Sequence, residues 1–92
     1  MRVKVKLWGV FQELSGGKSE FILEVPKRAT VGSLVNQLIR LYGKQFEREL
    51  FQLGTRKVKP YVKLLLNGHG TALSAKLKED DVVAIFPPVG GG

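Results

Sequence analysis

The last seven residues of the chain are the ones whose types and order most directly suggest chemistry. They read Phe-Pro-Pro-Val-Gly-Gly-Gly and follow a strand-like apolar run, Val82 to Phe86. Proline lacks the backbone N–H and fixes φ, so Pro87 and Pro88 end sheet pairing and hold the chain extended. Glycine has no Cβ and can pass where other backbone lies close on both sides. The reactive group of this tail is the α-carboxylate of Gly92, which we expect the domain to present to other proteins.

A frayed end or a cloning remnant is the plain alternative for this tail. At a background glycine usage of about 7 per cent, two terminal glycines arise by chance in roughly one chain in 200. The apolar strand that leads directly into Pro-Pro-Val makes the arrangement more specific than the glycines alone. We therefore expect a domain of residues 1–86 and a flexible tail of residues 87–92, with Gly92 as the reacting residue. The partner-binding residues of this interpretation are Phe86, Pro87, Pro88, Val89, Gly90 and Gly91.

Length and composition limit the class of protein. The chain has 92 residues, which is enough for one domain with a small core. It contains no cysteine, and this excludes disulfides, thiolate metal sites and a cysteine nucleophile. No apolar run approaches the roughly 20 residues of a membrane span, and no signal peptide is visible. We expect a cytoplasmic protein without membrane contact.

The charge balance is basic, with 15 Lys and Arg against 8 Asp and Glu and a formal net charge of +7. Such a balance favours acidic proteins, nucleic acids or anionic substrates as partners. Nucleic acid is the lesser alternative, because the lysines are scattered along the chain. One basic face with interleaved aromatics is expected from two strands: Lys4, Lys6, Trp8, Tyr61 and Lys63. It suits single-stranded RNA and an acidic protein equally well, and a plain solvated face is the alternative to both.

The first half of the chain predicts two strands and two helices. Alternating apolar residues predict strands over residues 2–8 and Glu20–Val25, whose outward charges can pair across a hairpin. The connection between them suggests a short helical turn that places Phe11 and Leu14 on the core. Apolar residues at helical spacing predict the main helix, from an N-cap at Thr30 to Gly43. A shorter helix is expected over residues 44–51, with Phe46 and Leu50 inward.

The second half predicts a loop and two more strands. Residues 52–60 are expected to form a loop, and strands are expected over residues 61–66 and 82–86. Asn67-Gly68 is a strong turn dipeptide that ends the third strand. Residues 69–78 are poorly determined, although Leu73 and Leu77 can pin them to the core. The order strand, strand, helix, strand, strand predicts an α+β roll with helices on one face of a mixed sheet of four to five strands. The first and last strands are expected at its centre.

With these elements placed, the chain resembles the small subunit of molybdopterin synthase, related ubiquitin-like sulfur carriers and the small archaeal modifier proteins. The specific motif is the terminal run from Val83 to Gly92. Further matching residues lie along the chain: Phe11, Glu13, Leu14, Gly16, Thr30, Val31, Leu34, Asn67, Gly68, Leu77, Lys78 and Asp81. The resemblance implies a ubiquitin-like β-grasp fold with one main helix and a short second helix.

The resemblance also implies a function. A ubiquitin-activating-like adenylating enzyme would use ATP to form an acyl-adenylate on Gly92, and a sulfur donor would convert it to a thiocarboxylate. The molybdopterin synthase large subunit would then use this sulfur on a pterin precursor, in molybdenum or tungsten cofactor synthesis. The chain would be a non-catalytic small subunit and co-substrate, with no bound cofactor and no metal. Unlike family members that are acidic or neutral, this chain is basic, which leaves the identity of its partners open.

Two other functions stay open at this point. The first is a ubiquitin-like protein modifier that is conjugated through Gly92 to lysines of target proteins. The second is a basic β-grasp module that binds RNA or serves tRNA thiolation. Two weaker candidate sites have plain structural explanations. His69, the one histidine, is expected to be an exposed bystander, and the run Glu79, Asp80 and Asp81 is expected to be a solvated turn.

Overall fold

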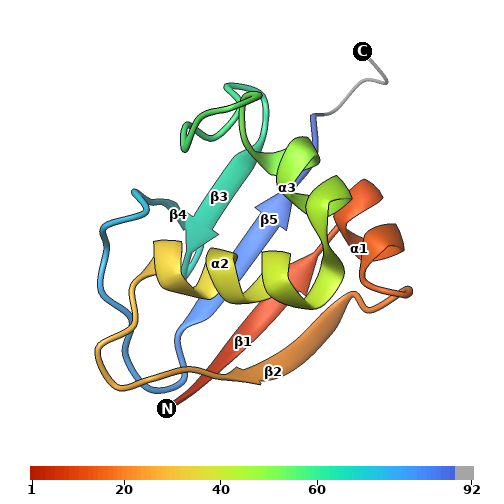
Figure 1. Ribbon diagram of the computed structural model, residues 1–92. Coiled ribbons are helices and arrows are strands. Elements are labelled where there is room, and N and C mark those ends of the chain that lie inside the picture. The colour runs from red at the N-terminus through yellow and green to blue at the C-terminus, as the bar shows by residue number, and fades with distance from the viewer. Residues whose placement is uncertain (89–92) are drawn as a thin grey trace.

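A five-stranded mixed sheet is the centre of the fold in the computed structural model, which describes residues 1–88 (Figure 1). The first and last strands pair in parallel, and every other neighbouring pair is antiparallel. The prediction that these two strands are central is confirmed. Across the sheet the strands are β2 (Glu20–Glu24), β1 (Arg2–Leu7), β5 (Val82–Phe86), β3 (Lys63–Leu66) and β4 (His69–Gly70).

Side-chain alternation gives the sheet one buried face and one open face. Along β1, Val3, Val5 and Leu7 are fully buried, whereas Lys4 and Lys6 point to the other side. Successive side chains of a strand point to opposite faces, so the apolar set of each strand meets the helices. The core so formed is apolar and includes Phe11, Leu34, Val35, Leu38, Phe46, Leu50, Val83 and Ile85.

Three helices cover the buried face of the sheet: α1 (Val10–Leu14), α2 (Val31–Tyr42) and α3 (Lys44–Leu50). The main helix, α2, begins at Thr30 as predicted. The Thr30 hydroxyl accepts from the Ser33 N–H at 3.1 Å, and the Thr30 N–H donates to the Ser33 hydroxyl at 2.7 Å. This reciprocal capping box satisfies two backbone donors that a helix start otherwise leaves unpaired. Gly43, at φ 94°, ends α2 and begins α3.

The third strand begins later than the sequence predicts. Pro60 and Tyr61 lie in a turn that the Val62 N–H closes onto the Lys59 carbonyl at 3.0 Å, so β3 starts only at Lys63. The prediction that Tyr61 belongs to the strand is therefore wrong. The apolar alternation continued through Tyr61, but proline favours a turn at this point and the Val62 donor is used inside that turn.

Residues 67–82 are held by side-chain hydrogen bonds as well as by the core. Asn67 and Gly68 both have positive φ, at 52° and 85°, as a tight two-residue hairpin turn requires. Asn67 Nδ2 donates to Asp81 at 2.9 Å, and the Val82 N–H donates to Asn67 Oδ1 at 2.8 Å. Asp81 also accepts from the Lys78 N–H at 2.7 Å. The acidic run is thus a turn, and Asp81 stabilises it.

The predicted α+β class is confirmed by these elements. Leu77 is buried and Leu73 packs against the core, as expected. Helix α1 confirms the helical turn expected after the first strand, with Phe11 buried and Leu14 packed against the core. One detail goes beyond the prediction: β4 adds a two-residue edge strand that begins at His69, whose side chain is exposed. Among residues 1–88, no helix has the length and apolar character needed to span a membrane.

Candidate functional site

The C-terminal tail leaves the domain at the end of β5, between β1 and β3. Ile85 pairs with Leu7 of β1, and Phe86 pairs with Lys63 of β3. Pro87 is half-buried and Pro88 is exposed, so the chain leaves the protein surface within these two residues. The predicted site residues Val89, Gly90, Gly91 and Gly92 lie outside the described residues.

An aromatic pair covers the point of exit. The rings of Trp8 and Phe86 stack with centroids 4.0 Å apart and planes at 17°. The Trp8 N–H also donates to the Ile85 carbonyl at 3.3 Å, which extends the β1–β5 pairing by one residue. A stacked aromatic pair contributes about 0.5–1.5 kcal/mol beyond the area it buries. Trp8 remains 39 % exposed, so the pair also offers apolar surface next to the tail.

Gly9 provides the surface on which Pro87 rests. Its backbone has φ 58° and ψ −129°, a region that side chains rarely adopt. A Cβ on Gly9 would lie 2.6 Å from Pro87 Cγ. Glycine is therefore needed at this position both for its backbone angles and for the close approach of the proline. We call Trp8, Gly9, Phe86 and Pro87 the tail base, because together they set the direction in which the chain departs.

The open face of the sheet continues from the tail base as a mixed surface of lysine and apolar side chains. Lys6 pairs with Ala84, and Ala84 pairs in turn with Leu65, so these residues lie side by side across three strands. Further from the tail, Glu20 faces Lys4 at 3.5 Å and Lys6 at 3.8 Å, as the predicted hairpin pairing required. Exposed pairs of this kind stabilise little, about 0–1 kcal/mol. Lys63 makes no ion pair within residues 1–88.

The predicted basic face is formed in part. Lys4 and Lys6 point outward from β1, Trp8 follows that strand, and Lys63 points outward from β3. Tyr61 is 76 % exposed but lies in the preceding turn rather than in β3. The face therefore presents one stacked aromatic pair, at the tail base, rather than aromatic side chains spread along two strands.

The titratable groups of the described region do not form an acid–base or metal site. Burial raises the pKa of the Tyr42 phenol, which packs between Phe21 and Phe46 and stays protonated. Within residues 1–88 no cluster of His, Asp and Glu is arranged to hold a metal ion. What the tail base does is to fix the direction in which Phe86 and Pro87 leave the sheet.

Two features of the tail base were not predicted from the sequence: the Trp8–Phe86 stack and the role of Gly9. A signal for both was present, because an aromatic residue ends each of the two strands that were expected at the centre of the sheet. If the two strands are parallel, their aromatic ends lie at the same edge of the sheet, and the glycine after Trp8 then lies beside the proline after Phe86.

Comparisons with known proteins agree on one family and one fold. The family model described as the ThiS family matches residues 5–92. Small archaeal modifier protein 3 of Haloferax volcanii is 34% identical over 96 residues, with 100% of each chain covered. Among solved structures, a putative molybdopterin converting factor, subunit 1, from Pyrococcus furiosus is 32% identical, has a TM-score of 0.78, and is matched over 97% of this chain and 99% of its own.

A third relative extends the agreement. Small archaeal modifier protein 1 of Haloferax volcanii is 26% identical, has a TM-score of 0.81, and is matched over 100% of both chains. The predicted ubiquitin-like β-grasp fold is thereby confirmed, since this chain superposes on these solved structures along nearly the full length of each.

Proposed function

The chain belongs to the ThiS family of ubiquitin-like sulfur carriers, and from this premise we propose that it carries sulfur as a thiocarboxylate on Gly92 and delivers it to a pterin precursor of molybdopterin. In this role it is the small subunit of a molybdopterin synthase. The observation that carries the proposal is the full-length similarity, at 32% identity, to the putative molybdopterin converting factor subunit of Pyrococcus furiosus.

The chemistry proceeds in two steps on one carboxylate. An oxygen of the Gly92 carboxylate attacks the α-phosphorus of ATP in an adenylating enzyme, which forms an acyl-adenylate and releases pyrophosphate. A sulfide equivalent then attacks the acyl carbon and displaces AMP, which leaves a thiocarboxylate. The thiocarboxylate sulfur is the nucleophile that the large subunit directs at the pterin precursor in a site that excludes water.

The tail base supports this function by holding the exit of the tail in one direction. Two different clefts must accept the same tail, one in the adenylating enzyme and one in the large subunit. Gly90, Gly91 and Gly92 have no side chains to collide with either cleft. The apolar surface of Trp8 and Phe86, flanked by Lys6 and Lys63, is the surface on which each partner would seat before the tail enters.

Intact-protein mass spectrometry tests this proposal. The chain is incubated with lysate of its source organism, ATP and a sulfide donor, and the exchange of one oxygen for one sulfur is sought. Trypsin cleaves after Lys78 and finds no later Lys or Arg, so the exchange should fall on the peptide of residues 79–92. A chain that lacks Gly92 should remain unchanged. Sulfur found elsewhere, or gained equally by the shortened chain, would contradict the proposal.

A second function, conjugation to other proteins, is favoured by the 34% identity to small archaeal modifier protein 3. The two functions share adenylation and differ in the group that attacks the acyl carbon, which is then a lysine amine of a target. The same digest distinguishes them, because conjugation leaves residues 79–92 attached to lysines of other proteins. If the branched peptides are found and the thiocarboxylate is absent, the carrier proposal is wrong and the modifier function replaces it.

A further inference from the structure

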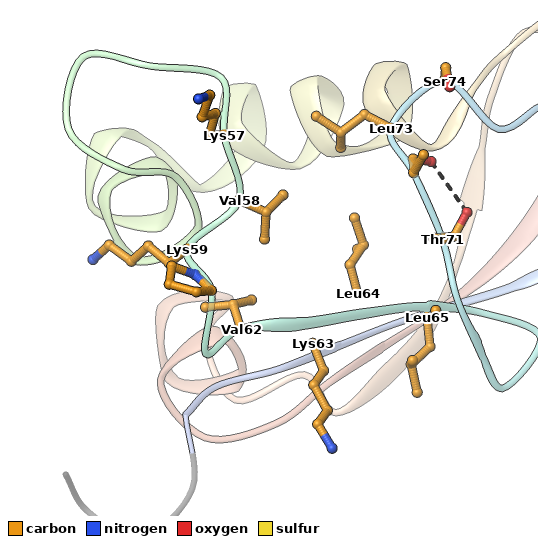
Figure 2. Close-up of a pocket in the computed structure, with 13 residues that line it drawn as sticks. Lys57, Val58, Lys59, Val62, Lys63, Leu64, Leu65, Thr71, Leu73 and Ser74 are labelled. Carbon is orange, nitrogen blue, oxygen red and sulfur yellow. Dashed lines mark hydrogen bonds between the residues drawn. The ribbon is translucent and has the colours of Figure 1, made fainter.

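A groove at the β3–β4 edge of the sheet lies outside the tail base, and Lys63 is the residue that borders both. Its volume is about 960 Å³, and it lies between residues 57–60, strand β3 and residues 70–74. Figure 2 shows Val58, Leu64 and Leu73 pointing toward one another across it, from the loop, the strand and the following segment. Leu64 is 7% exposed, and the other two are half-buried. The groove therefore has an apolar floor that is open to solvent, in the size range of about 300–1,000 Å³ typical of ligand pockets.

The two walls of the groove are held apart by different helices. On one side, the Lys59 N–H donates to the Leu50 carbonyl at 2.9 Å, which ties the loop to the end of α3. On the other side, the Gly32 N–H donates to the Leu73 carbonyl at 2.8 Å, which ties that segment to the start of α2. Because each wall is bonded to its own helix, the groove is formed before any ligand arrives.

The floor of the groove is also an unpaired edge of the sheet. Strand β4 has two residues, which pair with Leu65 and Leu66. The Thr71 N–H still donates to the Leu64 carbonyl at 3.2 Å, but the chain then turns away toward α2. Within residues 1–88, Lys63 and Leu64 have a strand neighbour on the β5 side only. An extended peptide can pair with such an edge through its backbone.

The charge around the groove has one sign. From Leu50 to Lys78 the chain contains no Asp or Glu, and it contains six Lys and Arg. Three of these, Lys57, Lys59 and Lys63, line the groove. Figure 2 shows Lys63 and Leu65 on the opposite side of β3 from Leu64. A strand laid beside β3 would therefore direct alternate side chains into the apolar groove and toward the basic open face.

We infer that the groove binds an extended segment of another protein in which apolar and acidic residues alternate. The segment adds to the edge of β3, places its apolar side chains against Val58, Leu64 and Leu73, and places carboxylates near Lys59 and Lys63. The site shares no residue with the tail base. It is a second interaction surface. Its charge and its free strand edge indicate the class of partner, which is an extended segment with alternating apolar and acidic residues.

Amide chemical shifts of the full chain test this inference. The probe is a capped seven-residue peptide that alternates aspartate with isoleucine or valine, titrated into the ¹⁵N-labelled protein. We expect saturable shifts at residues 57–59, 63–66 and 70–74, with a Kd below about 1 mM. A peptide with lysine in place of aspartate should not bind. Raising the salt concentration should weaken binding, because the ion pairs are near the surface.

Matched variants distinguish the effect of the groove residues on peptide binding from the effect of the net charge of the protein. The double variant K57E/K59E and the control K27E/R28E change the net charge equally, and only the first should weaken binding, by about tenfold or more. Leu73→Ser should weaken binding, whereas Leu53→Ser, at a residue 87% exposed outside the groove, should not. Each variant is first checked for a native amide spectrum.

Three outcomes would overturn the inference. The first is the absence of saturable shifts at about 1 mM peptide. The second is equal weakening by both charge variants, which would mean that net charge alone attracts the peptide. The third is a set of shifts at the groove with an oligouridine probe and none with the peptide, which would make the groove a nucleic-acid site.

Discussion

The two ends of β5 are held by different kinds of interaction. Where the strand begins, side-chain hydrogen bonds link Asn67, Asp81 and the backbone of Lys78 and Val82. Where it ends, Phe86 stacks on Trp8 and Pro87 rests on Gly9, and within residues 1–88 none of these four residues makes a side-chain hydrogen bond. Side-chain hydrogen bonds hold one end, whereas at the other end stacking and close apolar contact add to a backbone hydrogen bond from Trp8 to Ile85.

This difference shows how one strand serves both stability and presentation. Hydrogen bonds at the beginning of β5 set its register, because each bond requires one particular partner. Stacking and steric contact at its end set the direction of Phe86 and Pro87. Under the proposed function, this is the end that enters other proteins, and its stacking and steric contacts can be exchanged for contacts with them. We expect substitutions at the beginning of β5 to change mainly the free energy of unfolding. Substitutions at its end should change mainly the rate of thiocarboxylate formation.

Removal of Gly92 should have the largest effect on function and the smallest on the fold. Thiocarboxylate formation should be lost completely, because the next residue presents a carboxylate one residue short of the partner's reacting groups. The melting temperature should change by less than about 2 °C, since the core is built from residues 3–85. Mass spectrometry and calorimetry measure the two quantities. A large fall in the melting temperature would mean that the tail belongs to the fold.

Gly9→Ala should slow thiocarboxylate formation by about tenfold or more, because the added Cβ displaces Pro87 and redirects the tail. It should also cost about 1–3 kcal/mol of stability, from strain at a positive φ. Gly54→Ala is the matched control, since Gly54 has φ 71° and no neighbouring atom within 4 Å. Equal loss of activity in both variants, measured as rates of thiocarboxylate formation under the same conditions, would remove the tail-directing role from Gly9.

Asp81→Ala should lower the free energy of unfolding by about 1–2 kcal/mol, because the Lys78 N–H and the Asn67 amide lose their acceptor. The rate of thiocarboxylate formation should stay the same, since this residue lies at the other end of β5. Asp81→Asn keeps one acceptor oxygen and should fall between the wild type and Asp81→Ala. Urea unfolding measures the change, and a loss of activity without a loss of stability would contradict the division between the two ends.

Trp8→Ala should lower the free energy of unfolding by about 1 kcal/mol, because Trp8 is partly exposed and loses mainly its stacking contact with Phe86. Trp8→Phe should restore most of it. Circular dichroism is the suitable probe, because Trp8 is the one tryptophan of the chain. If Trp8→Ala instead unfolds the domain, the Phe86 end of β5 is part of the core. The proposed difference between the two ends of β5 is then wrong.

Most strands and helices of the fold could be predicted from the sequence, because each is specified by residues that are close together in the chain. Alternation in β1 and the Thr30 cap of α2 each follow from neighbouring residues, and the structure confirms both. The start of β3 was not predictable from alternation, because the turn at Pro60 competes with the strand for the same residues. Strand β4 was missed because two residues at a sheet edge leave no periodic pattern.

The candidate site was predictable only where it follows from the order of residues. The run from Phe86 to Gly92 can be seen in the sequence, and its chemical role remains a prediction. The tail base and the groove join segments far apart in the chain, such as Gly9 with Pro87 and Val58 with Leu73. No single stretch of sequence carries these contacts, because they depend on the parallel pairing of β1 with β5 and on how the loops pack against the helices.

The parallel pairing of β1 with β5 also has a mechanical consequence. The tail continues from the end of β5, and the N-terminus of the chain continues from the start of β1. Force applied between these two points pulls the strands past each other along their length. The hydrogen bonds between them are then loaded together rather than one after another. If the tail is pulled while the N-terminus is held, the domain therefore resists extension. The force is then transmitted through the domain without unfolding it.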